Sequence, residues 1–208
     1  MSEAIIINKG TGAGGSNTNL SGIAFENKTD NETRLLHNGF VRKPIPKKEK
    51  TKHGYYLEKI YNNQTIHFVK QNGLKFYMSY FHQKELFREV DEAYIFIDNT
   101  SSTITLKVLE KKNQNDRGSV EDKLCLGPYF QNIEYPNCLG ENFIVKYAFC
   151  LSTFLKNLYL SDHTKWKIVR AQNEQNKISV LFGDADDYFT KLDDWIYTTA
   201  SAGLETSL

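Results

Sequence analysis

The chain has 208 residues, 40% of them hydrophobic and 25% charged, which is the composition of a globular protein of one domain. Its formal net charge of +1 gives no bulk indication of a polyanionic partner, although a local basic surface is enough to neutralise phosphates. Three cysteines without a C-x-x-C spacing argue against a disulfide framework or a zinc site and favour reduced thiols in a cytoplasmic protein. The acidic Glu3 argues against a signal peptide, and no apolar run approaches the roughly 18 residues of a membrane span.

The N-terminal part predicts a short strand over residues 4–7, a glycine-rich stretch over 10–15 and a helix over about 18–36. Either Asn17 or Thr18 would cap this helix, and its buried stripe would comprise Leu20, Ile23, Ala24 and Leu35. The glycines also match the G-x-G-x-x-G pattern of dinucleotide-binding folds. Because no second strand ending in an acid follows the helix, we favour a turn over a dinucleotide site.

A basic segment over residues 41–53 combines two prolines with six cations and predicts an extended, solvated loop. Two interpretations of the loop remain open, contact with nucleic-acid phosphates or simple solvation. The cations are Arg42, Lys43, Lys47, Lys48, Lys50 and Lys52.

The middle of the chain predicts two hairpins, one over residues 55–70 and one over 93–112 with its turn at 99–102. Residues 73–87 between the hairpins are ambiguous between strand and helix. Ser119 would open a further helix, which Gly127-Pro128 should end or bend.

The C-terminal part predicts buried strands at 143–152 and 178–182, helices over 153–174 and an amphipathic helix over 184–199. The acids at the start of this last helix favour a dipole role over a calcium site. Its buried stripe would be Ala185, Phe189, Leu192 and Ile196. The order of elements predicts one α/β domain over residues 1–208, with a mixed central sheet flanked by helices.

Candidate catalytic residues concentrate on the second hairpin. Asp91 begins its first strand, while Glu110 and Lys112 end the second and, being two apart, project from one face. The hairpin would bring Asp91 close to Glu110, and two adjacent carboxylates require a cation between them. Magnesium fits such hard oxygen ligands, and Lys112 would orient a water and offset developing negative charge. This combination predicts hydrolysis of a phosphodiester.

The arrangement of Val90-Asp91 and Glu110-Lys111-Lys112 resembles the PD-(D/E)XK nuclease superfamily, with Val90 where a proline is usual. A group of type II restriction endonucleases has similar sequences in three regions, residues 12–29, 91–124 and 187–196, so the resemblance covers most of the chain. It implies a restriction-endonuclease-like fold and Mg²⁺-dependent cleavage of double-stranded DNA at a specific short sequence. It also implies active-site roles for Glu26 and Gln114.

Cutting both strands of a symmetric DNA site would suit a homodimer. Three other functions remain open: a DNA repair or recombination nuclease, a catalytically inactive DNA-binding module of the same fold, and a scaffold protein. The intact set of Asp91, Glu110 and Lys112 argues against the inactive module.

Overall fold

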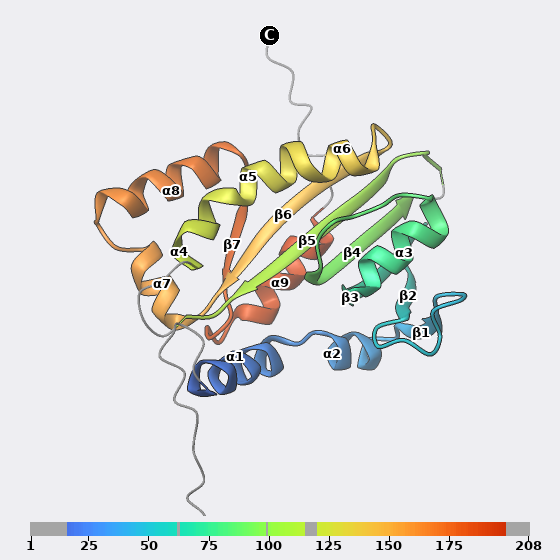
Figure 1. Ribbon diagram of the computed structural model, residues 1–208, viewed down its shortest axis with the longest axis horizontal. Coiled ribbons are helices and arrows are strands. Elements are labelled where there is room, and N and C mark those ends of the chain that lie inside the picture. The colour runs from blue at the N-terminus through green and yellow to red at the C-terminus, as the bar shows by residue number, and fades with distance from the viewer. Residues whose placement is uncertain (1–15, 62, 99, 115–119, 199–208) are drawn as a thin grey trace, which may run out of the picture.

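The computed structural model describes residues 16–61, 63–98, 100–114 and 120–198 (Figure 1). The strand expected at residues 4–7, the glycine-rich stretch at 10–15 and the helix start at Ser119 lie outside these residues.

Within the described residues, seven strands form one sheet in the order of the sequence, with β1 to β5 antiparallel and β5, β6 and β7 parallel. The antiparallel neighbours β2–β3 and β4–β5 are joined by short hairpins, whereas helices make the parallel crossovers. The strands are β1 (Val41–Pro44), β2 (Tyr55–Tyr61), β3 (Gln64–Gln71), β4 (Val90–Asp98), β5 (Ile104–Lys112), β6 (Phe143–Leu151) and β7 (Ser179–Phe182). The prediction of an α/β fold with a mixed sheet and two hairpins is confirmed.

The helices cover both faces of the sheet (Figure 1). On the first face lie α3 (Gly73–His82), α4 (Val120–Lys123), α5 (Gly127–Tyr129), α6 (Tyr135–Leu139), α7 (Thr153–Tyr159) and α8 (Thr164–Gln175). A 3₁₀ turn, η1 (Leu124–Leu126), and a π-helical turn, η2 (Phe130–Glu134), complete the run between α4 and α6. On the second face lie α1 (Ser16–Thr29), α2 (Glu32–His37) and α9 (Tyr188–Tyr197).

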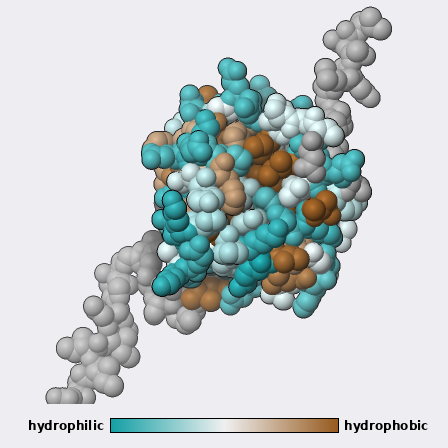
Figure 2. Space-filling view, turned by 90° about the vertical axis from the view of Figure 1, so that its right-hand side faces the viewer, coloured by the Kyte–Doolittle hydropathy of each residue, from teal (hydrophilic) through white to brown (hydrophobic). Residues whose placement is uncertain are grey.

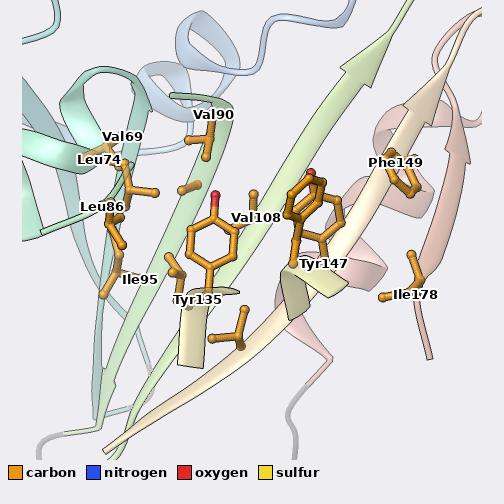
Figure 3. Packing of buried hydrophobic residues seen from close by; sticks show 14 of the residues in the cluster. Val69, Leu74, Leu86, Val90, Ile95, Val108, Tyr135, Tyr147, Phe149 and Ile178 are labelled. Carbon is orange, nitrogen blue, oxygen red and sulfur yellow. The ribbon is translucent and has the colours of Figure 1, made fainter. Parts of the chain in front are cut away.

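Each face of the sheet has its own hydrophobic core, because side chains of a strand alternate between the faces. On the first face, the Tyr147 ring lies between those of Tyr135 of α6 and Phe149, and Val108 belongs to the same core (Figure 3). On the second, Leu109 and Cys150 pack with Leu192 of α9. Figure 2, which views the molecule from the side of α3 and β1, shows small apolar patches separated by polar side chains. The segment 73–87, which the sequence left ambiguous between strand and helix, forms the helix α3 over its first ten residues.

The single helix expected over 18–36 is wrong, since α1 ends at Thr29 and α2 begins at Glu32. The break contains Asn31, which is fully buried and donates to Tyr94 and Glu92 of the sheet instead of continuing a helical ladder. The expected buried stripe is also wrong in part: Ile23 is 54% exposed and Ala24 is exposed, while Phe25 and Leu35 are buried. The side chain of Leu20 lies outside the described part.

The expected solvated loop over 41–53 is wrong over its first residues, which form the strand β1. Pro44 is tolerated there because β1 is the edge strand of the sheet that the described residues form. Ile45 is fully buried and its N–H donates to the carbonyl of Gly54 at 2.9 Å, which closes the remaining loop at its base.

Of two expectations about helix ends, one is confirmed in part and one is wrong. The helical turn η1 ends at Leu126, just before Gly127-Pro128, but the chain continues directly as α5 from Gly127, where a Cβ would lie 2.9 Å from the Phe149 ring. The acids before α9 are not in its first turn: Asp184 instead accepts from the N–H of Thr153, at the start of α7. Because α9 begins only at Tyr188, Ala185 of the expected buried stripe lies outside it. Leu192 and Ile196 of that stripe are buried as expected.

Candidate active site

The β4–β5 hairpin brings the three predicted catalytic residues to one end of the sheet. Its register pairs Ala93 with Val108 and Glu92 with Leu109, and Asp91 and Glu110 are the residues that follow this last pair. Ala93 and Val108 belong to the core of the first face, and Asp91, Glu110 and Lys112 follow them at two-residue spacing on that face. The Oδ2 atom of Asp91 accepts from the backbone N–H of Lys111 at 2.6 Å.

The electrostatics of this cluster depend on two carboxylates and one ammonium group. Burial, and then the nearby charge of Glu110, raise the pKa of Asp91 to about 7, although the Lys111 N–H partly offsets this. The Nζ atom of Lys112 lies 2.5 Å from Oε1 of Glu110. At neutral pH a proton or a cation at Asp91 therefore relieves the repulsion between the two acids.

The three residues are divided between two cavities. Glu110 and Lys112 line a cavity of about 360 Å³ on the first face. Asp91 lines another of about 230 Å³, which reaches α1 and the basic loop. The second cavity is lined by Glu26, Asn27, Asp30, Lys52, His53, Lys70, Gln71, Asp91 and Lys111.

The two residues assigned from the resemblance alone lie differently. Glu26 of α1 is exposed and shares the smaller cavity with Asp91. Gln114 lies just beyond β5, where its carbonyl accepts from the Ser152 hydroxyl at 3.3 Å. Within the described part of the chain, the linings of the two cavities do not include Gln114.

The six cations of the basic segment have unequal environments. Arg42 pairs with Glu32, and Lys43 pairs with Glu58 at 2.5 Å. The Nζ atom of Lys48 lies 4.9 Å from the centre of the Phe76 ring. The cations exposed on the loop after Ile45 include Lys47, Lys50 and Lys52, and Lys52 also lines the cavity of Asp91.

Sequence reasoning missed a buried ion pair on the opposite face of the sheet from the candidate catalytic residues. Lys111 donates to Glu92 at 2.7 Å and to the carbonyl of Thr29 at 2.9 Å. Glu92 is 1% exposed and also accepts from the Asn31 N–H and the Tyr94 hydroxyl. The signal was available in the alternation along β4 and β5, which turns Glu92 and Lys111 to the face opposite their neighbours.

The donor set suits Mg²⁺ better than a metal that needs a full protein cage. Among the residues described, no group of three or more His, Cys, Asp or Glu side chains could hold a metal ion. Magnesium, however, binds through one or two carboxylates together with waters and substrate phosphate, and Asp91 and Glu110 are the candidate carboxylates. Across the same residues, no helix is both long and apolar enough to cross a membrane.

Comparison of the chain with protein-family models, with curated proteins and with solved structures finds no match. The functional assignment therefore depends on the geometry of the site and on the sequence pattern that resembles PD-(D/E)XK nucleases.

Proposed function

We propose that the protein is a Mg²⁺-dependent endonuclease that hydrolyses phosphodiester bonds of double-stranded DNA, in the manner of a type II restriction endonuclease. One observation carries the proposal: the end of the β4–β5 hairpin places Asp91, Glu110 and Lys112 together, where burial and then the charge of Glu110 raise the pKa of Asp91 to about 7, and Lys112 lies 2.5 Å from Glu110. Two acids and a lysine of this kind suit catalysis at a phosphodiester.

Each residue has a distinct role in this proposal. Asp91 and Glu110 would hold Mg²⁺, which when bound would polarise a phosphate oxygen and lower the pKa of a water. The Lys111 N–H fixes Oδ2 of Asp91 and leaves its other oxygen to act as a ligand. Lys112 would orient the attacking water and offset negative charge on the phosphate. Glu26, in the same cavity as Asp91, would bind there as an additional acid.

The DNA would run past the basic loop, with Lys47, Lys50 and Lys52 contacting phosphates. A homodimer would cut the two strands of a symmetric site, and the mass of the protein in solution by light scattering tests that assembly.

The proposal is tested with supercoiled plasmid and Mg²⁺, using the wild-type protein, Glu110→Gln and Lys112→Met. Discrete fragments that both variants fail to produce, with loss of about a hundredfold or more in rate, are expected. Two exposed positions supply the controls: Glu141→Gln, before β6 and far from the end of β5, and Lys167→Met on α8 should cut like wild type.

The pattern of products separates the alternatives. Smearing, or preference for branched DNA, would indicate a repair or recombination nuclease. DNA binding without cleavage would indicate an inactive binding module. Full activity of Glu110→Gln and Lys112→Met would rule out the assigned site.

A further inference from the structure

The cavity beside Glu110 and Lys112 is walled largely by aromatic rings. Its volume of about 360 Å³ falls within the range of roughly 300–1,000 Å³ in which proteins hold small organic ligands. The rings in its lining are those of Phe87, Phe130, Tyr135, Tyr147 and Phe149. An acid and a lysine on one side and aromatic walls on the others suit a planar ring attached to a charged group.

The inner wall is held rigidly by packing between the sheet and the π-helical turn η2. The Tyr147 ring centroid lies 5.5 Å from that of Phe130 and 5.3 Å from that of Phe149. Gln131 of η2 accepts from the Tyr147 N–H at 3.0 Å and donates to the carbonyl of Asn176 at 2.8 Å. A π-helical turn is a rare element that is frequent at functional sites, and here it sets the spacing between Phe130 and Tyr135.

Two hydroxyl groups in this wall are available for a ligand. Tyr135 and Tyr147 are each 3% exposed, and neither hydroxyl has a hydrogen-bond partner among the residues that the structure describes. Figure 3 shows both oxygens pointing toward the end of the sheet where β4 begins at Val90. Each hydroxyl can donate and accept a hydrogen bond, so both can meet the polar edge of a ligand in the cavity.

The mouth of the cavity combines apolar side chains with charges of both signs, because Glu89 also lines it and Arg88 pairs with Glu134 at 2.8 Å. Phe87 is 76% exposed there, next to Arg88, and Leu126 is 43% exposed. Lys123 of α4 also lines the cavity and is exposed. An exposed aromatic ring offers a stacking surface for a base, and the lysine suits a phosphate.

We infer that this cavity binds one unstacked nucleobase of the DNA strand whose phosphate lies at Glu110 and Lys112. The inference rests on the proposed function, and it adds a substrate subsite to it. The base would enter past Phe87 and lie against the inner rings, and its polar edge would meet the hydroxyls of Tyr135 and Tyr147. The cavity would then contribute to the choice of base beside the cut.

The inference is tested by calorimetric titration of the full-length protein, in a chelator, with each of the four deoxynucleoside 5′-monophosphates and with 2-deoxyribose 5-phosphate. At least one nucleotide should bind about tenfold more tightly than the sugar phosphate, because only the nucleotide carries a base. Phe87→Ala should remove this difference, and its exposed position keeps the variant folded. Tyr61→Ala, an exposed aromatic of β2, is the control and should retain it.

Tyr147→Phe, which keeps the ring and removes the hydroxyl, should reduce the differences among the four nucleotides. Nucleotides that bind no more tightly than the sugar phosphate, or an unchanged difference in Phe87→Ala, would overturn the inference. Plasmid cleavage is scored separately, so cleavage without base-dependent binding removes the cavity assignment and leaves the nuclease. Base-dependent binding without cleavage supports the cavity and counts against the nuclease.

Discussion

Lys111 and Lys112 are neighbours in the sequence, yet they face opposite sides of the sheet and pair with different acids, Glu92 and Glu110. Lys111 neutralises Glu92, which is 1% exposed, at a distance of 2.7 Å. Lys112 lies beside Glu110 in a cavity. A charge left alone in a protein interior is far more costly than one beside solvent. Loss of Lys111 should therefore mainly lower stability, whereas loss of Lys112 should mainly lower activity.

We predict that Lys111→Met lowers the free energy of unfolding by about 3–5 kcal/mol, because it leaves the buried Glu92 carboxylate unpaired. Lys112→Met should change it by about 1 kcal/mol or less, as for partly exposed ion pairs, while abolishing cleavage. Urea unfolding measures both. The double variant Glu92→Gln/Lys111→Met should recover part of the loss, and equal losses in the two single variants would refute this division of roles.

The pKa of Asp91 predicts how the metal-free protein responds to pH. Burial and Glu110 raise that pKa to about 7, well above the value in an unfolded chain, so the folded protein binds the extra proton. The resulting stability is fully present below about pH 4 and is lost as pH rises through about 7, by about 4 kcal/mol.

Urea unfolding in a chelator between pH 4 and 8 should therefore show a steeper decline for wild type than for Asp91→Asn, which cannot titrate. Asp162→Asn removes a fully exposed carboxyl and should behave as wild type. Parallel curves for wild type and Asp91→Asn would mean that Asp91 ionises normally.

The sequence could place the candidate residues at one end of the hairpin because that prediction needed only the two-residue period of a strand and a short turn. Glu110 and Lys112 line one cavity, as their spacing predicts, whereas the sequence could not show that Asp91 lines a different one. It could not show that Arg42 and Lys43 are engaged by Glu32 and Glu58, since these partners come from other elements. Ion pairs across a fold depend on packing, which local patterns do not encode.

At the scale of elements, the strands and most helices could be predicted, whereas the interruptions could not. Continuous apolar runs gave β6 and β7, and alternation gave both hairpins. The break between α1 and α2 depends on Asn31, whose partners Glu92 and Tyr94 are about sixty positions away. A polar residue inside a helical pattern looks unremarkable until its buried partners are known.

Helix α9 ends on a buried lysine that comes from the centre of the sheet. The Nζ atom of Lys107 donates to the carbonyls of Trp195, Ile196 and Thr198 at 2.8, 2.9 and 2.7 Å. Such carbonyls have no partner within their own helix, and a cation there also favours the helix dipole. At pH 7 the amine is still protonated, because burial, followed by the charge of Lys146, lowers its pKa only to about 8.

We predict that Lys107→Met destabilises the fold by about 1–3 kcal/mol, since it leaves buried carbonyls unsatisfied. In Lys107→Met, hydrogen exchange should speed up in α9 and much less in α8, relative to wild type. The control Lys167→Met, on the exposed face of α8, should leave exchange in both helices unchanged. If exchange in α9 were unchanged, the three contacts would not be what fixes its C-terminus.

At the scale of the whole molecule, the end of the sheet that carries the candidate site is where α1, the basic loop and the crossover helices converge. The cavity of Asp91 is bordered by Glu26 from α1 and Lys52 from the basic loop. The cavity of Glu110 is bordered by Lys123 from the crossover. Although the net charge is only +1, Lys52 and Lys123 place positive charge beside the site, where a phosphate backbone could contact it.

This arrangement predicts which cations contribute to DNA affinity. Lys50 and Lys52 are exposed on the loop, whereas Arg42 and Lys43 are held by carboxylates. Lys50→Gln/Lys52→Gln should weaken binding of duplex DNA at every sequence and reduce the slope of log affinity against log salt by about 0.9 for each lost phosphate contact. Lys167→Gln/Lys177→Gln removes the same charge from exposed positions of α8 and the turn that follows it. Fluorescence anisotropy in chelator across a salt series measures both slopes, and equal slopes in the two variants would show that bulk charge, and not the loop, attracts the DNA.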